Sequence, residues 1–234
     1  MKLAVDFHIH TALSPCADKD MTPNNIVNMS ILKGLDAIAI TDHNSIENCG
    51  ACIELSQDKD ILVIPGMELQ TKEEIHLVCL FRNIESASQF QSIVYSRLKE
   101  ENIPEIFGRQ LIFDKEDNII GENKKMLIAS ADISVNEAFD KVRKQGGIIF
   151  PAHIDRSGYS IIANLGFIPA NLPMKVVEIS KRCDLEKLIS ENKYLLKYQF
   201  LRNSDAHYLA DIMERENFIE VKRKSIESIF EALL

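Results

Sequence analysis

The 234-residue sequence contains no apolar run that approaches the roughly 20 residues needed to cross a bilayer. Its N-terminus also lacks the charged and then apolar pattern of a secretory signal peptide. The densest basic cluster is the KRK at positions 222–224, and the formal net charge is −8. These absences predict a cytoplasmic protein with no membrane partner. They also predict that the protein has no broad basic surface for binding long duplex nucleic acid.

Cysteine is scarce, with five residues in the chain. The odd count, in a chain long enough to build a sizeable apolar core, argues against a disulfide framework. Cys49 and Cys52 form one CxxC pair without a second pair or a nearby histidine, so a turn of helix is favoured over a zinc knuckle or a redox motif. The sequence also contains no convincing nucleophile elbow, P-loop or dinucleotide-binding glycine motif.

Histidine is almost as scarce, but all six residues lie at or beside one end of a short apolar run. Most have a carboxylate or another histidine as a close neighbour in the sequence. Glu68 closes a further apolar run, and Asp205 precedes the last histidine by two residues. Imidazole and carboxylate together form the ligand set of Zn, Mn or Fe. Eight groups are therefore candidate metal ligands: His8, His10, His43, Glu68, His76, His153, Asp205 and His207.

Seven short apolar, β-branched runs predict buried strands. Their continuous apolar character is typical of strands covered on both faces, as in a parallel α/β sheet. Helical segments lie between them. In the first of these, Thr22 is the expected N-cap, Pro23 takes the first helical position, and Gly34 ends the helix. The strands are expected at residues 3–8, 37–41, 61–65, 76–81, 147–151, 176–179 and 200–203.

Two further helices have clear boundaries. Ser134 and Glu137 predict a capping box for a helix that stops at Gly146, and residues 225–234 predict a docking helix with one apolar face. The alternation of strand and helix favours one α/β domain over residues 1–234, a closed or nearly closed barrel. In such barrels the chemistry gathers at the C-terminal ends of the strands, where most of the candidate ligands lie. His76, near the start of its own run, is the exception.

Residues 82–145 interrupt the alternation of strands and helices, because the stretch is too long for one loop or one crossover. The sequence predicts a helix over about 87–101, which stops before Pro104, and then a hairpin that turns near Asp117 and Asn118. A long insertion in a barrel either builds the wall or lid of the pocket or only decorates the surface. The sequence leaves both roles open.

The spacing of the ligands indicates their chemistry. His8 and His10 share one face of a strand, because side chains alternate along it, so the pair can chelate one ion. Asp6 points the same way and is expected to orient an imidazole, while Asp42 is expected to ligate or to orient. Eight groups exceed what one ion uses, so two or three divalent ions (Mn, Fe or Zn) are expected. Such clusters hold an oxyanion and generate hydroxide near neutral pH, which predicts hydrolysis of a phosphate ester or, as the alternative, of an amide.

The order of these motifs resembles the PHP family, whose name stands for polymerase and histidinol phosphatase. The resemblance rests on DFHIHT (6–11), ITDHNS (40–45), GMEL (66–69), IHL (75–77), PAH (151–153) and NSDAH (203–207), which span nearly the whole chain. It implies a distorted seven-stranded β/α barrel with a trinuclear metal centre, and an insertion between the fourth and fifth strands.

The resemblance also implies how the ligands are shared. The first ion would be held by His8, His10, Glu68 and Asp205. Glu68 would bridge to a second ion on His76 and His153, and His43 and His207 would hold the third. The chain departs from the family at the remaining ligand of the third ion, where Cys16 stands in place of His or Asp and Asp18 follows two residues on. Either Cys16 or Asp18 ligates, or the third site is weak or empty.

By the same resemblance, the expected activity is hydrolysis of a small phosphomonoester, of nucleotide type because nucleotide-type phosphatases of the family carry the insertion. A metal-bound hydroxide would attack phosphorus in line, with Glu68, Asp205 and Arg156 as the catalytic residues. Arg156 follows a ligand by three residues and would hold the phosphate, unless it forms an ordinary surface ion pair. Lys181 and Arg182 follow a strand and would bind substrate from the same rim.

Three alternatives to this activity stay open. The first is a histidinol phosphate phosphatase, and the second is a 5′-to-3′ nuclease that acts on short single strands. The third is a metal-binding scaffold without turnover. The oligomeric state is also open.

Overall fold

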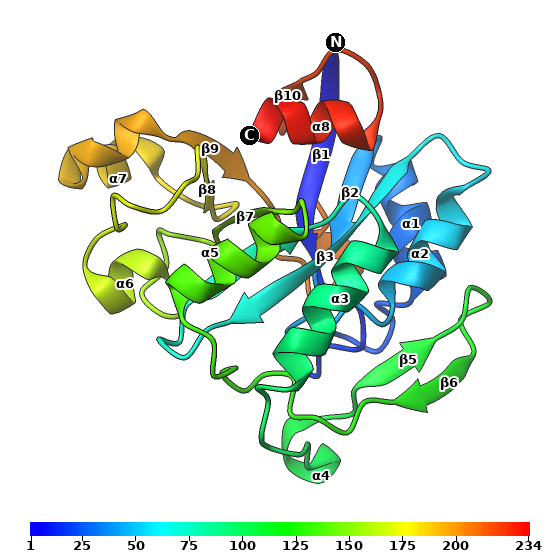
Figure 1. The fold of residues 1–234 in the computed structure, drawn as a ribbon. Helices are drawn as coiled ribbons and strands as arrows, with labels where there is room; N and C mark the ends of the chain where they lie inside the picture. Colours follow the sequence, from blue (N-terminus) through cyan, green and yellow to red (C-terminus); the bar gives the residue numbers. More distant parts are fainter.

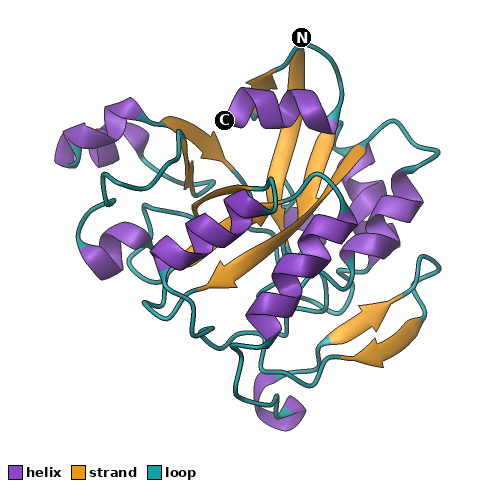
Figure 2. Cartoon of the chain, in the orientation of Figure 1, coloured by secondary structure: helices purple, strands orange, loops and turns teal.

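The computed structural model describes residues 1–234 and shows a mixed α/β fold in which helices surround a curled sheet (Figures 1 and 2). All seven runs predicted as strands form strands, and the third extends to Gln70, five residues further than predicted. The strands are β1 (Lys2–Ile9), β2 (Ala37–Ile40), β3 (Leu62–Gln70), β4 (His76–Leu80), β5 (Leu111–Phe113), β6 (Ile119–Glu122), β7 (Ile148–Pro151), β8 (Val176–Ile179), β9 (Gln199–Arg202) and β10 (Phe218–Glu220).

The helices connect and cover these strands. They are α1 (Pro23–Leu32), α2 (Cys49–Ser56), α3 (Ile84–Tyr95), α4 (Pro104–Phe107), α5 (Val135–Lys144), α6 (Ile161–Leu165), α7 (Leu185–Glu191) and α8 (Ile226–Leu233). No helix of the structure is long and apolar enough to cross a membrane. As expected, Cys49 and Cys52 lie in a turn of helix, in α2, where both are buried.

Six strands form the main sheet, in the order β10-β1-β2-β3-β4-β7. β1, β2 and β3 are parallel, whereas β4 is antiparallel to both of its neighbours and β10 is antiparallel to β1. β8 and β9 form a separate parallel pair. The expectation of a purely parallel sheet is therefore wrong, and the sequence also gave no indication of β10.

The reversed direction of β4 has a simple physical cause. Only residues 71–75 join it to β3, whereas a parallel connection needs a crossover of about a dozen residues or more. β4 must therefore turn back along β3, which pairs His76 with Gln70. Because β4 is reversed, its first residue lies at the same edge of the sheet as the last residues of the neighbouring strands. This explains why His76 begins its strand while the other ligands lie at or after strand ends.

The β8–β9 pair connects the β1 side of the sheet with the β7 side. The segment after β9 meets the end of β1, where His10 N–H donates to Ala206 O (3.0 Å) and Ala206 N–H donates to His8 O (3.2 Å). On the other side, Ile154 N–H donates to Glu178 O of β8 at 2.9 Å. The result is a curled half-barrel sheet of six strands with a two-stranded pair beside it, so the expected count of seven barrel strands is not confirmed.

The predicted helix signals operate as expected. The Thr22 side chain caps α1 by accepting from Asn25 N–H, and Gly34 follows the helix with a φ of +73°, a left-handed conformation that favours glycine. Ser134 Oγ accepts from Glu137 N–H at 3.2 Å at the start of α5, which is one of the two hydrogen bonds of the predicted capping box. α8 buries Ile229, Phe230 and Leu233 against the same core as β1, and burial of such side chains stabilises the fold by roughly 1.5–3 kcal/mol each.

Residues 82–145 contain α3, α4 and a hairpin of β5 and β6, with a residue of left-handed φ, Asp117, in its turn. The hairpin was predicted at this position, while the helix begins and ends earlier than expected. Figure 1 shows the hairpin apart from the main sheet, with α4 beyond it. The segment still contacts the chain that follows β1 and β2, because Leu111 N–H donates to Ala12 O at 3.0 Å and Phe113 N–H donates to Asn48 Oδ1 at 2.9 Å.

Candidate metal centre

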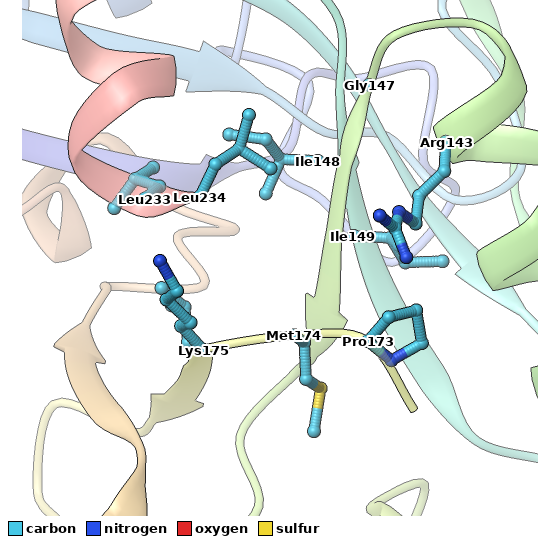
Figure 3. A pocket seen from close by; sticks show the side chains of 10 residues that line it. Arg143, Gly147, Ile148, Ile149, Pro173, Met174, Lys175, Leu233 and Leu234 are labelled. Carbon is cyan, nitrogen blue, oxygen red and sulfur yellow. The ribbon is translucent and has the colours of Figure 1, made fainter. Parts of the chain in front are cut away.

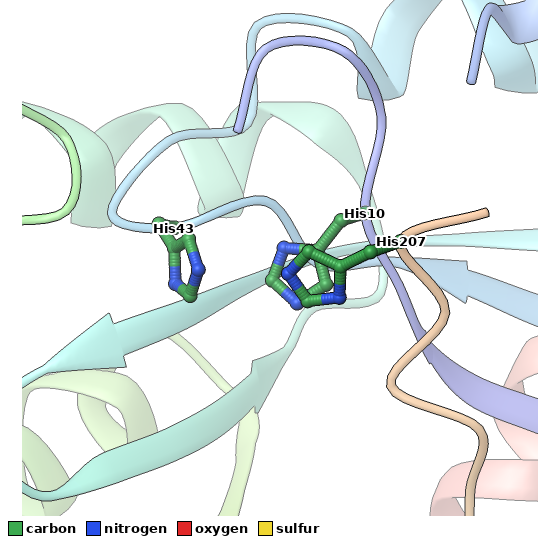
Figure 4. Close-up of side chains that lie close together, drawn as sticks. All are labelled: His10, His43 and His207. Atoms are coloured by element: carbon green, nitrogen blue, oxygen red, sulfur yellow. The ribbon is translucent and has the colours of Figure 1, made fainter. Parts of the chain in front are cut away.

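The eight side chains expected to bind metal come together at the ends of six strands. β1 carries His8 and is followed directly by His10, while Glu68 lies in β3. Figure 4 shows His10 and His207 overlapping, with His43 facing them across a short gap. The remaining members arrive as the topology requires: His43 follows β2, His76 opens β4, His153 follows β7, and Asp205 and His207 follow β9.

The first group of ligand atoms consists of His8, His10, Glu68 and Asp205. His8 Nε2 lies 3.1 Å from His10 Nε2 and 3.2 Å from Glu68 Oε1. Asp205 Oδ1 lies 3.3 Å from the first of these nitrogens and 3.1 Å from the second. An ion with bonds of about 2.0–2.2 Å places adjacent ligand atoms about 3.0–3.5 Å apart. The spacing therefore fits a single small ion.

Glu68 lies at the centre of the cluster. Its Oε1 is 2.8 Å from His76 Nδ1 and 3.2 Å from His153 Nε2, and its Oε2 is 2.9 Å from His43 Nδ1. His43, Glu68 and His76 form a second group whose ligand atoms lie within 4.8 Å of one another. A carboxylate with both oxygens among imidazoles is suited to bridge two ions.

Gly66 lets β3 present Glu68 at this point. A Cβ on Gly66 would lie 2.9 Å from the Thr41 side chain of the neighbouring loop and 3.0 Å from the Cys79 carbonyl of β4. Real Cβ atoms essentially never approach other atoms so closely, so β3 fits between its neighbours only with glycine here. The GMEL segment therefore combines a packing requirement with a ligand two residues later.

A third group contains His10, His43 and His207. The ring centroid of His10 is 4.2 Å from that of His207 and 4.5 Å from that of His43. Cys16 and Asp18 belong to none of the three groups. Cys16 is exposed, and the Asp18 carboxylate accepts from Asp20 N–H at 2.8 Å, although Asp18 N–H also donates to His207 O at 2.9 Å. Both residues thus lie beside the third group, and ligation by either stays a prediction.

Unpartnered polar atoms test whether the cluster fits metal ions. Five buried side-chain nitrogen or oxygen atoms have no hydrogen-bond partner, and four of them are His43 Nδ1, Glu68 Oε2, His153 Nδ1 and Asp205 Oδ1. His43 Nδ1 and Glu68 Oε2 lie 2.9 Å apart without forming a hydrogen bond. Leaving a buried polar atom unpaired costs about 1–3 kcal/mol, so this concentration in one place fits a set of donors arranged for cations.

The carboxylates of the cluster are held in their charged form. Burial raises the pKa of Glu68, but His76, His8 and His43 outweigh it and hold the pKa well below its usual value. Burial likewise raises the pKa of Asp205, but His8 and His10 outweigh burial and hold this pKa well below its usual value. Both groups are therefore anionic at neutral pH and available to cations.

The imidazoles respond in opposite ways. Burial lowers the pKa of His10, yet the neighbouring carboxylates of Asp205 and Glu68 outweigh it and raise this pKa to about 9. Burial and the charge of His10 lower the pKa of His43. The Glu68 carboxylate and a hydrogen bond between His43 and Cys16 outweigh them and raise this pKa to about 9. Burial and His10 lower the pKa of His207 to about 3. Without metal, protons therefore occupy part of the positions that ions would take.

Glu178 orients His8, and sequence reasoning missed it. Its two carboxylate oxygens each lie 3.0 Å from His8 Nδ1, which turns His8 Nε2 toward the ligand group. Glu178 also accepts from His153 N–H at 3.0 Å and from Asn203 Nδ2 at 2.7 Å. A carboxylate on a metal-binding imidazole fixes the ring and increases its basicity. The available signal was a charged residue inside the otherwise apolar run VVEI.

Asp42 orients a ligand as expected, but indirectly. It accepts from Ser14 Oγ at 2.7 Å, and Ser14 Oγ lies 3.0 Å from His10 Nδ1. Asp6 does not orient an imidazole, which corrects the expectation for it. Its carboxylate accepts from the backbone N–H groups of Ser204 and Met213, both at 3.0 Å, and so holds the loop after β9 in place.

Backbone strain concentrates at the cluster. Six non-glycine residues have positive φ, and four of them are Asn44 (+50°), His153 (+28°), Tyr159 (+56°) and Asp205 (+51°). Such conformations persist only where the surrounding structure imposes them, and they are enriched at functional sites. Asn44 follows a ligand directly, and two of the four are ligands themselves.

The cluster opens into a small cavity of about 160 Å³, whose rim carries Arg156 and Tyr159. Arg156 Nη1 lies 2.5 Å from Asp205 Oδ2, and the Tyr159 ring stacks on His76 with centroids 4.8 Å apart. Arg156 and Asp205 also line a neighbouring cavity of about 640 Å³. That second cavity has no hydrophobic residue in its lining and includes Lys181 and Arg182, so it brings these two predicted residues to the same rim.

A separate cavity of about 260 Å³ lies at the opposite end of β7 and β8 (Figure 3). Its lining is mainly apolar, with Ile148, Met174 and Leu233 among the residues, and it contains none of the candidate ligands. The candidate ligands thus lie at the other end of these strands.

Comparison with known proteins gives independent evidence on the family of this chain. A family model described as the PHP domain matches residues 6–153, more than half of the chain. A curated protein of Methanocaldococcus jannaschii is 28% identical over 163 residues, which cover 70% of this chain and 18% of that protein. The curated relatives that match are longer, since the chain spans between 18% and 59% of their lengths.

Solved structures share the fold at low sequence identity. The lesion-specific endonuclease Q of Pyrococcus furiosus has a TM-score of 0.74 and 19% identity, over 100% of this chain and 56% of that one. A candidate metal-dependent phosphoesterase of Bifidobacterium adolescentis has a TM-score of 0.66 and 15% identity, over 97% and 94% of the two chains. At these identities the likeness establishes the fold alone.

Proposed function

Because the chain belongs to the PHP domain family, whose members are metal-dependent hydrolases, we propose that it hydrolyses a small phosphomonoester of nucleotide type. The observation that carries this proposal is the group of His8, His10, Glu68 and Asp205, whose atoms are spaced as the ligands of one small ion. The other ligands gather around the same glutamate, which supports two or three divalent ions (Mn, Fe or Zn) rather than one.

The side chains of the cluster have different roles in binding the ions. Divalent ions, when bound, supply Lewis-acid charge and lower the pKa of a water molecule. Glu68 and Asp205 contribute the negative charge that holds them, and the imidazoles complete their ligand sets. Glu178 and Asp42 keep His8 and His10 in position, the latter through Ser14. The buried walls exclude competing solvent from all but the small cavity above the cluster.

Arg156 is the cation that we assign to the substrate phosphate. Its guanidinium is partly exposed at the rim and rests on Asp205, so a phosphate above the cluster is within reach of a small side-chain movement. A planar guanidinium offers two parallel N–H donors to phosphate oxygens. Lys181 and Arg182 are assigned to the rest of the substrate, because they line the adjoining polar cavity. A wholly polar lining favours a hydrophilic alcohol over a lipid.

A nuclease activity is the second candidate. The fold likeness that supports it extends over nearly the whole chain and includes a complex of endonuclease Q with a 27-mer duplex that carries an abasic lesion. The expectation that this chain has no duplex nucleic acid substrate therefore loses its support, since net charge does not describe the potential of one local groove. The adjoining polar cavity would accept a sugar–phosphate continuation of the substrate as readily as a free alcohol.

A metal-supplemented phosphate-release screen tests the proposal. Nucleotides, sugar phosphates, histidinol phosphate and short single-stranded or duplex oligonucleotides are each incubated with Mn²⁺, Zn²⁺ or Fe²⁺. Release from a nucleotide but not from histidinol phosphate is expected, and the reverse result would assign the histidinol phosphate alternative. Stepwise shortening of an oligonucleotide would assign the nuclease.

His10→Ala and Glu68→Ala serve as the inactive controls, because both residues belong to the first ligand group. Lys72→Ala is a matched control, since Lys72 is exposed and lies in the loop between two ligand-bearing strands. If the two ligand variants release phosphate at the wild-type rate, the assignment is wrong. Metal binding without turnover on any substrate of the panel would favour the scaffold alternative.

A further inference from the structure

Gln70, the last residue of β3, lies between a candidate ligand and the 82–145 segment. Its side chain is buried, and its Oε1 lies 3.0 Å from His76 Nε2. An amide oxygen only accepts, so His76 Nε2 must carry the proton of the neutral ring. His76 Nδ1 then has a free lone pair, and this atom is the one 2.8 Å from Glu68 Oε1. Two acceptors at that distance need a positive charge between them, which is a metal ion or, in its absence, a second proton on the ring.

The Gln70 amide is also held from outside the sheet. Gln70 Nε2 donates to Ser130 Oγ at 2.9 Å, while Gln70 Oε1 faces His76 Nε2. The backbone of the same segment pairs with Gln70 as well, because Ala131 N–H donates to Gln70 O at 2.9 Å. If the amide turned over, its NH₂ group would face the protonated nitrogen of His76. The segment therefore holds the side chain that pairs with His76 Nε2.

Asn44 provides a second connection of the same kind. Its Nδ2 donates to Leu127 O at 2.7 Å and to Ala129 O at 2.8 Å, and its Oδ1 accepts from Gln70 N–H at 3.0 Å. Asn44 directly follows ligand His43 and has a φ of +50°. Residues 127–131 are thus hydrogen-bonded to the loop after β2 and to the end of β3 at once.

On the basis of the proposed metal centre, we infer that Gln70 is a positioning residue for the ion held by His76, and that Ser130 of the 82–145 segment holds Gln70 in its working orientation. The segment is therefore part of the metal centre's support rather than a surface decoration. An outer partner of a metal-binding histidine typically changes metal affinity by about 10- to 100-fold when it is removed.

Metal titration of the purified chain tests the inference. The number and affinity of bound Mn²⁺ ions are measured by calorimetry for the wild type, Gln70→Leu, Gln70→Glu and Ser130→Ala. Gln70→Leu should bind one ion about 10- to 100-fold more weakly and leave the others unchanged. Gln70→Glu keeps an acceptor toward His76 and should bind the same ion at least as tightly as the wild type, while Ser130→Ala should weaken that ion by a smaller factor.

Gln110→Leu is the matched control. Gln110 is a buried glutamine of the same segment that bonds to Asn123 O, Lys125 O and Leu127 N–H and touches no ligand. It should lower the urea midpoint measured in chelator without changing the number of bound ions. Equal binding by Gln70→Leu and the wild type, or equally weak binding by Gln70→Leu and Gln70→Glu, would overturn the inference. Absence of metal binding by the wild type would instead overturn the proposed function on which it rests.

Discussion

Replacing Glu178 by glutamine should lower both the metal affinity and the stability of the fold. The hydrogen bonds of Glu178 indicate the size of each effect. The carboxylate receives three donors: His8 Nδ1–H and His153 N–H at 3.0 Å, and Asn203 Nδ2–H at 2.7 Å. In Glu178→Gln the amide oxygen can keep the first two. Its NH₂ group then faces the Asn203 NH₂ group, and two donors meet in a buried site.

Asn203 cannot relieve this conflict by turning over. Its Oδ1 accepts from Phe7 N–H at 3.0 Å, so a flipped amide would leave that backbone donor unpaired instead. One unsatisfied buried group costs about 1–3 kcal/mol, which is a substantial part of the roughly 5–15 kcal/mol that stabilises a typical domain. Metal affinity should also fall by about 10- to 100-fold, because a neutral amide makes His8 a weaker ligand than a carboxylate does.

Urea denaturation in chelator measures the first effect, and calorimetric titration with Mn²⁺ measures the second. The double variant Glu178→Gln with Asn203→Asp restores an acceptor opposite the new NH₂ group and keeps one for Phe7 N–H. It should recover most of the lost stability but not the metal affinity. If Glu178→Gln binds every ion with wild-type affinity, Glu178 does not control His8 and the reasoning is refuted.

Three further predictions follow from the same site. In the metal-free protein, the raised pKa of about 9 for His10 and His43, against the usual 6.5, gives stability that is complete below pH 6.5 and lost as the pH rises through about 9. The Tm of the metal-free protein should therefore fall between pH 6.5 and 9. Metal affinity should rise over the same pH range, because protons leave the ligands. A Tm that does not change over this range would contradict the prediction. Arg156→Ala should lower kcat/KM for a phosphomonoester by about 10- to 150-fold, with Arg156→Lys intermediate, and unchanged steady-state kinetics would exclude its contact with phosphate. Cys16→Ser should lower Zn²⁺ affinity more than Mn²⁺ affinity if Cys16 completes the third group, and equal titration curves would remove it from the ligands.

Much of the site could be predicted from the sequence because metal chemistry restricts the residue types so strongly. Histidine is rare in this chain, and each one lies beside a short apolar run, so a strand assignment alone placed seven of the eight ligands at one edge. His76 reaches that edge only because β4 is reversed. The HxH spacing of His8 and His10 also fixed their common face. The strand ends, the caps at Thr22 and Ser134, and the turn near Asp117 are local features, and local features are what a single sequence reports best.

The remaining features depend on contacts between distant segments. The sequence does not state the direction of β4, which follows from a loop too short for a crossover. Glu178 and Gln70 act through histidines that are far away in the chain or across a hairpin, and no spacing rule connects them. Asp6 shares a strand face with His8, yet its carboxylate turns to backbone donors of the loop after β9. Alternation along a strand gives the face of a side chain but not its partner.

The domain organisation stays a prediction. The structure gives the 82–145 segment its own helices and hairpin, together with hydrogen bonds to the ligand-bearing loops. We expect it to fold with the rest of residues 1–234 as one unit. Coincident loss of metal binding and of secondary structure in urea would agree with that expectation.

Phosphate release by metal-depleted and reconstituted protein tests the central claim most directly. The chain is stripped with a chelator, dialysed, and assayed on a phosphomonoester before and after addition of stoichiometric Mn²⁺ or Zn²⁺. The proposed centre predicts no activity in the stripped protein, and recovery that is complete only after two or three equivalents have been added. Activity that survives metal removal, or a protein that binds no divalent ion at all, would contradict the account.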